Sequence, residues 1–306
     1  MPLPAVDFAA VIIKFRDSIM NKFIVIGVTT VLLAGCESRA VTDTTGGATP
    51  TTGTPASGTI TVGDLQSAAL DTSTDELTVQ ITLDGDDLLQ SYGNGGAAGA
   101  YRVYTFQNSP TDREFTAYAG TSTDESVQAV VVMDGGQFNR FFGGAAVTQA
   151  NYTAPSGGII DYAGSYVGLL NFGPVAGAGV PGSGSSVPNA ATEVTGDVFL
   201  KADFTDGAVN GAVYNRLANS GATAMPELVL VVGTDIGADG SFSGAVEDDI
   251  TQTAWGTYSG VFGGTDASSV AGIVELGAGF LPAAIPGDGN EREVGIFVLD
   301  QVQPAP

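Results

Sequence analysis

Apolar and polar residues alternate in short stretches along most of the chain. Residues 76–83, ELTVQITL, place Leu77, Val79 and Ile81 on one side and polar residues on the other, which is the period of a half-buried β-strand. Further strands are predicted at residues 101–106, 115–118 and 128–133, and a short helix at residues 88–92. We therefore expect an antiparallel β region over residues 60–155.

From residue 157 onward the alternation becomes more regular, and two of the linking turns are Asp-Gly, a strong hairpin signal. Val198, Leu200 and Ala202 share one face of a predicted strand. The predicted strands are Ile159–Leu170, Glu193–Phe204, Ala208–Arg216, Glu227–Val232, Gly240–Val246, Trp255–Phe262, Ser269–Leu276 and Glu293–Leu299. Eight antiparallel strands suit a small closed barrel filled by side chains. The fold class is therefore all-β, with an eight-stranded barrel over residues 156–306.

The pattern G-x-Y-x-G occurs twice, as GSYVG from residue 164 and GTYSG from residue 256. In the second copy Tyr258, Gly260 and Phe262 fall on the same face of a predicted strand. A glycine between two aromatic residues leaves room for a neighbouring ring and permits the bend that barrel closure needs. We interpret the repeated pattern as a signature of the fold and not as a site.

The start of the chain carries a different pattern, since residues 20–36 read MNKFIVIGVTTVLLAGC. A positive start at Met20 precedes an apolar run that is shorter than the ~20 residues of a membrane-spanning helix but suits a secretory signal. The end of the run resembles the bacterial lipobox, which consists here of Leu33, Ala34, Gly35 and Cys36. That resemblance implies cleavage before Cys36 and lipidation of its sulfur, with residues 1–35 as the signal peptide.

Residues 36–59 are rich in Thr, Gly, Pro, Ala and Ser, a composition that predicts a flexible tether behind the lipid anchor. Glu37 stands where an inner-membrane retention signal usually has Asp, so the sorting rules of lipoproteins imply the outer membrane of a Gram-negative bacterium. Met20 is the expected initiator, which would leave residues 1–19 outside the protein as translated.

The composition of the chain excludes several classes of function. The net charge is -23, with 33 Asp and Glu against ten Lys and Arg, so nucleic-acid phosphates are repelled. The chain has no histidine and one cysteine, which excludes disulfides within the chain, Cys/His zinc sites and histidine-dependent triads. We therefore expect no catalytic residues, no cofactor and no metal site.

The barrel motifs resemble transferrin-binding protein B and the related surface lipoproteins. These motifs are GDVFLKADFTDGAVNGAVYN from residue 196, DGSFSGAV from residue 239 and WGTYSGVFGGTDASSVAGIVE from residue 255. The resemblance covers residues 157–300 and implies that residues 60–155 form a handle-like sheet. It also implies a non-enzymatic cell-surface lipoprotein that binds a protein or an iron- or haem-linked partner through its loops.

Several other segments have ordinary structural interpretations. Aspartates within residues 235–244 suit a turn better than a calcium loop, and the acidic run at residues 247–249 suits a solvated loop better than a carboxylate pair. Partner-binding residues are not identified, but the Gly- and Pro-rich loops 173–188 and 277–290 are the candidate partner-facing segments. A structural lipoprotein of the same fold, facing the periplasm without a ligand, remains the alternative.

Overall fold

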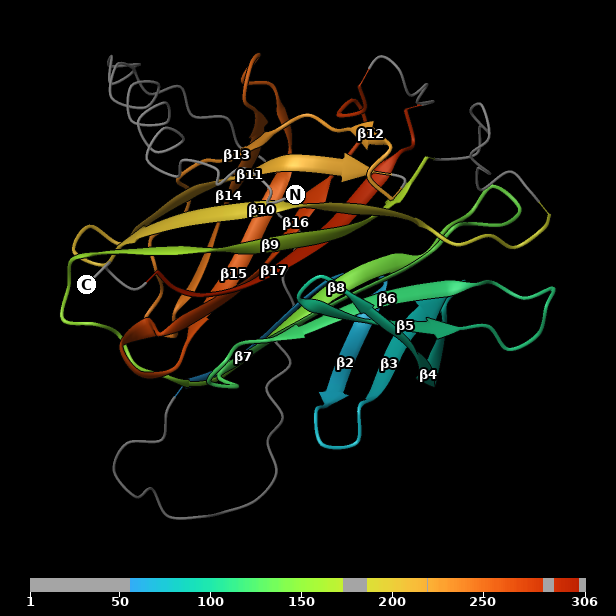
Figure 1. Cartoon of the computed structure of the whole chain (residues 1–306), viewed down its shortest axis with the longest axis horizontal. Coiled ribbons are helices and arrows are strands. Elements are labelled where there is room, and N and C mark those ends of the chain that lie inside the picture. The colour runs from blue at the N-terminus through green and yellow to red at the C-terminus, as the bar shows by residue number, and fades with distance from the viewer. Residues whose placement is uncertain (1–55, 173–185, 219, 283–288, 303–306) are drawn as a thin grey trace, which may run out of the picture. The chain divides into compact units, whose positions relative to one another are not determined.

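The fold was examined in a computed structural model that describes residues 56–172, 186–218, 220–282 and 289–302. These residues form two antiparallel β-sheets and one short 3₁₀ helix, η1 (Thr265–Ala267) (Figure 1). The predicted all-β fold class is confirmed. Among the described residues, no helix is long and apolar enough to cross a membrane.

The first sheet, which we call the handle sheet, has eight strands in the order β1-β8-β7-β6-β5-β4-β3-β2. Its strands are β1 (Ala56–Gly63), β2 (Leu65–Asp71), β3 (Glu76–Leu83), β4 (Asp86–Ala98), β5 (Tyr101–Phe106), β6 (Phe115–Thr121), β7 (Val127–Asp134) and β8 (Gly143–Tyr152). Its two outer strands follow one another in the chain with only Asp64 between them, so the sheet curls until it is nearly closed.

Two details of the handle sheet differ from the expectation. Residues 88–92 belong to strand β4, so the predicted short helix is wrong. Residues 77–81 of β3 pair with this segment along its whole length and hold it extended. Strand β1 starts at Ala56, within the range predicted as tether, because it pairs with β8.

The second sheet closes into the barrel. Its strands are β9 (Ile159–Asn171), β10 (Thr192–Asp203), β11 (Ala208–Ala218), β13 (Leu228–Leu230), β14 (Ser241–Asp248), β15 (Ala254–Gly263), β16 (Ser269–Leu276) and β17 (Arg292–Gln301). Pairing between β10 and β11 closes the ring, and the two-residue strand β12 (Thr223–Ala224) extends β11 outside it. The predicted eight-stranded barrel is confirmed, with each predicted strand in place.

Three apolar cores explain why some strands alternate and others are apolar throughout. One core fills the barrel, a second lies between the two halves of the curled handle sheet, and a third joins the handle sheet to the outside of the barrel. Strand β7 contributes Val131 to the joining core and Val132 to the handle core, so both of its faces are buried. A strand covered on both faces reads as a continuous apolar run.

Glycines inside the barrel make room for aromatic rings on the next strand. A Cβ added to Gly260 would lie 2.5 Å from Cζ of Phe242, which pairs with Gly260 across β14 and β15. A Cβ on Gly244 would likewise lie 2.5 Å from Cε1 of Tyr258. The predicted use of these glycines is confirmed, because each one accepts a ring that a larger residue would displace.

A charged pair crosses the barrel interior. Arg216 on β11 donates two hydrogen bonds of 2.6 Å to the carboxylate of Glu293 on β17, and both side chains are fully buried. The hydroxyl of Tyr166 donates to the same carboxylate at 2.6 Å. The two bonds from one guanidinium nitrogen, together with the tyrosine hydroxyl, offset the cost of burying the two charges.

The handle sheet and the barrel are also joined by a polar clasp around Asp124, in the turn between β6 and β7. Its carboxylate accepts hydrogen bonds from the hydroxyls of Ser122 and Ser126, both 2.7 Å, and of Ser268, 2.5 Å. Ser268 belongs to the SSVAG segment of the sequence. These bonds hold the pKa of Asp124 below its usual value against the opposing effect of burial.

Candidate partner-binding surface

The structure describes only some of the residues that the sequence analysis singled out. Cys36 and the lipobox residues lie outside the described residues, as do residues 173–185 of loop 173–188 and residues 283–288 of loop 277–290. Asp239 accepts hydrogen bonds from the backbone and hydroxyl of Ser241, as expected for a residue that shapes a turn. Asp248 accepts in the same way from Thr251. Within the described ranges, no three His, Cys, Asp or Glu side chains gather as a metal-binding group.

Strained backbone draws attention to the segment between β7 and β8. Gln137 and Arg140 form an isolated antiparallel bridge, with backbone hydrogen bonds of 2.8 and 3.0 Å around a two-residue turn. Both central residues have positive φ, 53° at Phe138 and 61° at Asn139. Asparagine tolerates this conformation, but a bulky residue at positive φ is an outlier that costs roughly 1–2 kcal/mol. Phe138 is nevertheless there, with 64% of its surface exposed.

A network of buried polar groups fixes this turn. Arg113 donates to the Asp134 carboxylate at 2.5 Å and to the carbonyls of Arg140 and Gln137 at 3.0 and 3.3 Å. The guanidinium of Arg113 also lies 4.6 Å from the centre of the Phe142 ring. The network therefore holds the backbone on both sides of Phe138 and compensates for the strain at that residue.

Asp134 is the centre of the network, with 1% of its side chain exposed. Burial raises the pKa of Asp134, although the Phe142 N–H and the Arg113 guanidinium act in the opposite direction. The Phe142 N–H and the Arg113 guanidinium hold the buried carboxyl group in place, and its pairing with Arg113 orients Arg113 toward the turn.

A second segment joins the turn from the barrel side. The side-chain amide of Gln137 donates to the carbonyl of Ser186 at 3.0 Å, and the backbone N–H of Gly135 donates to the carbonyl of Asn189 at 2.8 Å. Val187, between these two partners, has 67% of its surface exposed. The described end of the predicted loop 173–188 is therefore bonded to the handle turn, and together they expose two apolar side chains.

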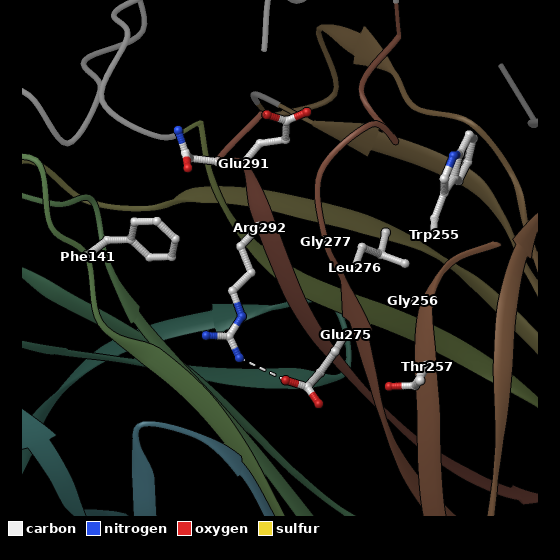
Figure 2. Close-up of a pocket in the computed structure, with 10 residues that line it drawn as sticks. Phe141, Trp255, Gly256, Thr257, Glu275, Leu276, Gly277, Glu291 and Arg292 are labelled. Atoms are coloured by element: carbon white, nitrogen blue, oxygen red, sulfur yellow. Dashed lines mark hydrogen bonds and ion pairs between the residues drawn. The ribbon is translucent and has the colours of Figure 1, made fainter. Parts of the chain in front are cut away.

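An open groove of about 500 Å³ adjoins the turn (Figure 2). Its lining comes from the β7–β8 segment and from the ends of β15, β16 and β17, and consists mainly of Phe141, Trp255, Leu276, Glu275, Glu291 and Arg292. Figure 2 shows Phe141 and Trp255 on opposite sides, with the ion pair between Arg292 and Glu275, 2.8 Å, between them.

Glu291 fixes the rim of the groove at the base of the predicted loop 277–290. Its two carboxylate oxygens accept backbone hydrogen bonds from Gly279 and Gly289, each 2.8 Å long. The side chain is buried. This loop and loop 173–188 leave the barrel at the same end, because Arg292 at the start of β17 pairs with Asn171 at the end of β9.

We call Phe138, Val187 and the groove lining together the turn–groove surface. Sequence analysis pointed to the two barrel loops but missed Phe138 and the groove, for identifiable reasons. The segment QFNRFF at residues 137–142 has an Asn-containing centre typical of a turn, and that signal was available. The network that fixes it joins residues 21 to 27 positions apart, and no local pattern reports such contacts.

Known proteins were compared with the chain at three levels. No protein-family model and no curated protein matches it. Solved structures do match. One is transferrin binding protein B from Haemophilus parasuis, with 12% sequence identity and a TM-score of 0.43. The match covers 81% of this chain and 45% of that chain. The corresponding protein from Neisseria meningitidis has 12% identity and a TM-score of 0.40, with 81% and 44% covered.

The N-lobe domain of lactoferrin binding protein B of Moraxella bovis is also similar, with 13% identity, a TM-score of 0.35, and 80% of this chain and 99% of that chain covered. The chain spans less than half the length of the two transferrin binding protein B structures. At these identities the similarity concerns the fold alone. These solved structures are named as transferrin and lactoferrin binding proteins, and the barrel motifs of this chain resemble the first of these.

Proposed function

We propose that this chain is a non-catalytic lipoprotein, anchored to the outer membrane through Cys36 and exposed at the cell surface, that binds a protein partner through the turn–groove surface. The observation that carries the binding role is Phe138. Its ring is 64% exposed on a backbone of positive φ that a buried network holds in place.

The positive φ and the exposed ring of Phe138 both lower the stability of the isolated protein, and the ring does not contribute to an apolar core. Backbone outliers of this kind cluster at ligand clamps and other functional sites, where the surrounding structure over-determines them. An aromatic side chain fixed before binding loses little conformational entropy when a partner covers it, and such anchors dominate many interfaces. Phe138 therefore suits a binding anchor better than a structural role.

The anchoring part of the proposal is supported by the sequence alone, through the apolar run and lipobox that end at Cys36. The test is expression of the full chain in a Gram-negative host fed an alkyne-tagged fatty acid. We expect label on the protein and its recovery in the outer-membrane fraction, and neither for Cys36→Ala. Label that persists in the variant would contradict lipidation at this residue.

The binding part requires a partner to be captured. Residues 40–306, which contain the compact unit Pro50–Pro306, can be used as bait for transferrins, lactoferrins, haem proteins and secreted proteins. Iron and haem carriers come first because the sequence motifs resemble those of lipoproteins that bind them. We expect a partner whose retention Phe138→Ala abolishes, while Leu89→Ala, which alters a residue of similar exposure, does not.

Protease treatment of intact cells distinguishes surface display from the alternative of a periplasmic structural lipoprotein. If the protein is displayed at the surface, we expect protease to degrade its folded part rapidly on intact cells. Complete protection, together with failure of the bait to retain any protein, would favour the structural alternative.

A further inference from the structure

The described part of the chain has no unpaired cation to offer a partner. Each of its six Lys and Arg residues makes an ion pair with a carboxylate of the same chain. The whole sequence has 33 acidic residues against ten basic ones. An anionic partner would meet repulsion at long range, whereas a cationic partner would be attracted and steered.

The groove of the turn–groove surface carries the same preference at short range. Trp255, the only tryptophan in the chain, lines the groove on the side opposite Phe141 (Figure 2). Tryptophan is the aromatic side chain that attracts cations most strongly. Glu275 lines the groove between Trp255 and Phe141, with 29% of its side chain exposed. Glu275 is paired with Arg292, which is 28% exposed, and Glu291 adds a second carboxylate to the lining, so the groove carries a net negative charge beside its aromatic residues.

Resting on the function proposed above, we propose that the partner is a basic protein and that the groove receives one of its lysine or arginine side chains. The cationic head lies against the indole of Trp255 within reach of the Glu275 carboxylate. Phe138, three residues before the groove residue Phe141, packs into an apolar surface of the same partner. Aromatic contact, desolvation and charge pairing then act at one place, as is typical of a binding hot spot.

Trp255 fluorescence reports directly on the groove because the chain has no other tryptophan. Titration of residues 40–306 with acetyl-Gly-Arg-Gly-amide is expected to give a saturating change in emission, and the matched Gly-Gln-Gly peptide none. Caesium ion is expected to quench this emission more strongly than iodide, in the unaltered protein. An equal response to both peptides, or a preference for acetyl-Gly-Glu-Gly-amide and iodide, would overturn the proposal.

A variant locates the effect. Glu275→Gln is expected to weaken the arginine peptide by about three- to fivefold, whereas Asp249→Asn, which removes a carboxylate from the β14–β15 turn, leaves it unchanged. Equal effects of the two variants would mean that net charge alone attracts the peptide and would overturn the assignment to the groove. A melting curve for each variant shows that it is folded.

Binding of the captured partner separates this inference from the proposed function. The affinity of a basic partner is expected to fall at least tenfold between 50 and 300 mM NaCl and to depend on Glu275. A partner that Phe138→Ala releases but that is insensitive to salt and to Glu275→Gln would overturn the inference and leave the function standing. If the arginine peptide binds but no partner is recovered, the cation preference of the groove stands and the proposed function falls.

Discussion

Phe138 is expected to lower the stability of the chain and to raise its affinity for a partner. Positive φ and an exposed ring destabilise the isolated protein, while the network around Arg113 prevents the turn from relaxing. Replacement by asparagine, which accepts this backbone, is expected to raise the free energy of unfolding by about 1 kcal/mol. The same change should weaken partner binding at least tenfold, since it removes the aromatic anchor that the partner would cover.

Urea denaturation and partner titration measure the two effects of Phe138→Asn side by side. Leu89→Asn is the matched control, because Leu89 is 62% exposed on the regular strand β4. The control should gain no stability and should keep its affinity for the partner. A Phe138 variant that is less stable than the parent would show that the ring contributes to folding, contrary to its proposed role.

The sequence was sufficient to predict those strands that are marked by alternating apolar residues and by turn residues close to them in the chain. Alternation in β10, where fully buried positions alternate with half-buried ones, and the Asp-Gly turns helped to place the barrel strands. Strand β8, GGAAVTQANY, was missed: its small residues are buried by neighbours on both sides of the handle sheet and carry little strand propensity of their own. Residues 88–92 failed for the same reason, since β3 determines their conformation.

Glycine–ring pairing is an element-scale property that one methyl group can test. Gly260→Ala would bring Cβ to within 2.5 Å of the Phe242 ring and 2.6 Å of the Ala271 carbonyl, so β14, β15 and β16 must separate. We expect a loss of about 1–3 kcal/mol in unfolding free energy. Gly93→Ala is the control, since the nearest atom to its Cβ is 3.8 Å away. A neutral Gly260→Ala would mean that the barrel yields at this point.

The clasp at Asp124 links two elements and should respond to acid. Its pKa is lower in the folded chain than the usual value of 3.8, so the ionised carboxylate stabilises the fold above about pH 4. That contribution disappears as the pH falls from there. Asp124→Asn should cost about 1 kcal/mol near pH 7 and progressively less as the pH falls below about 4, as measured by urea denaturation from pH 7 down to the lowest pH at which the chain stays folded. Asp206→Asn, in an exposed turn, should show no such convergence.

At the scale of the whole molecule, the handle sheet and the barrel share a core. Tyr118, Val131 and Ala145 of the handle pack with Val167 and Ile296 of the barrel. The tyrosine hydroxyl of Tyr101 also accepts the backbone N–H of Val298 at 3.2 Å and donates to the carbonyl of Ser165 at 2.7 Å. The sequence suggested two β regions, but outward-facing barrel residues such as Ile296 gave no indication of what would cover them. The turn–groove surface could not be predicted for the same reason.

A shared core predicts that the two sheets unfold together. Glu293→Gln leaves Arg216 buried without a full partner and should lower stability by about 3–5 kcal/mol, although it lies inside the barrel. Trp255 fluorescence reports on the barrel, and a dye on Ser73→Cys reports on the handle, because residues 40–306 contain no other cysteine. Both signals should shift to lower urea by the same amount and remain coincident. A handle transition that stays in place while the barrel transition moves would show that the halves fold independently, and the turn–groove surface would then lose its rigid support.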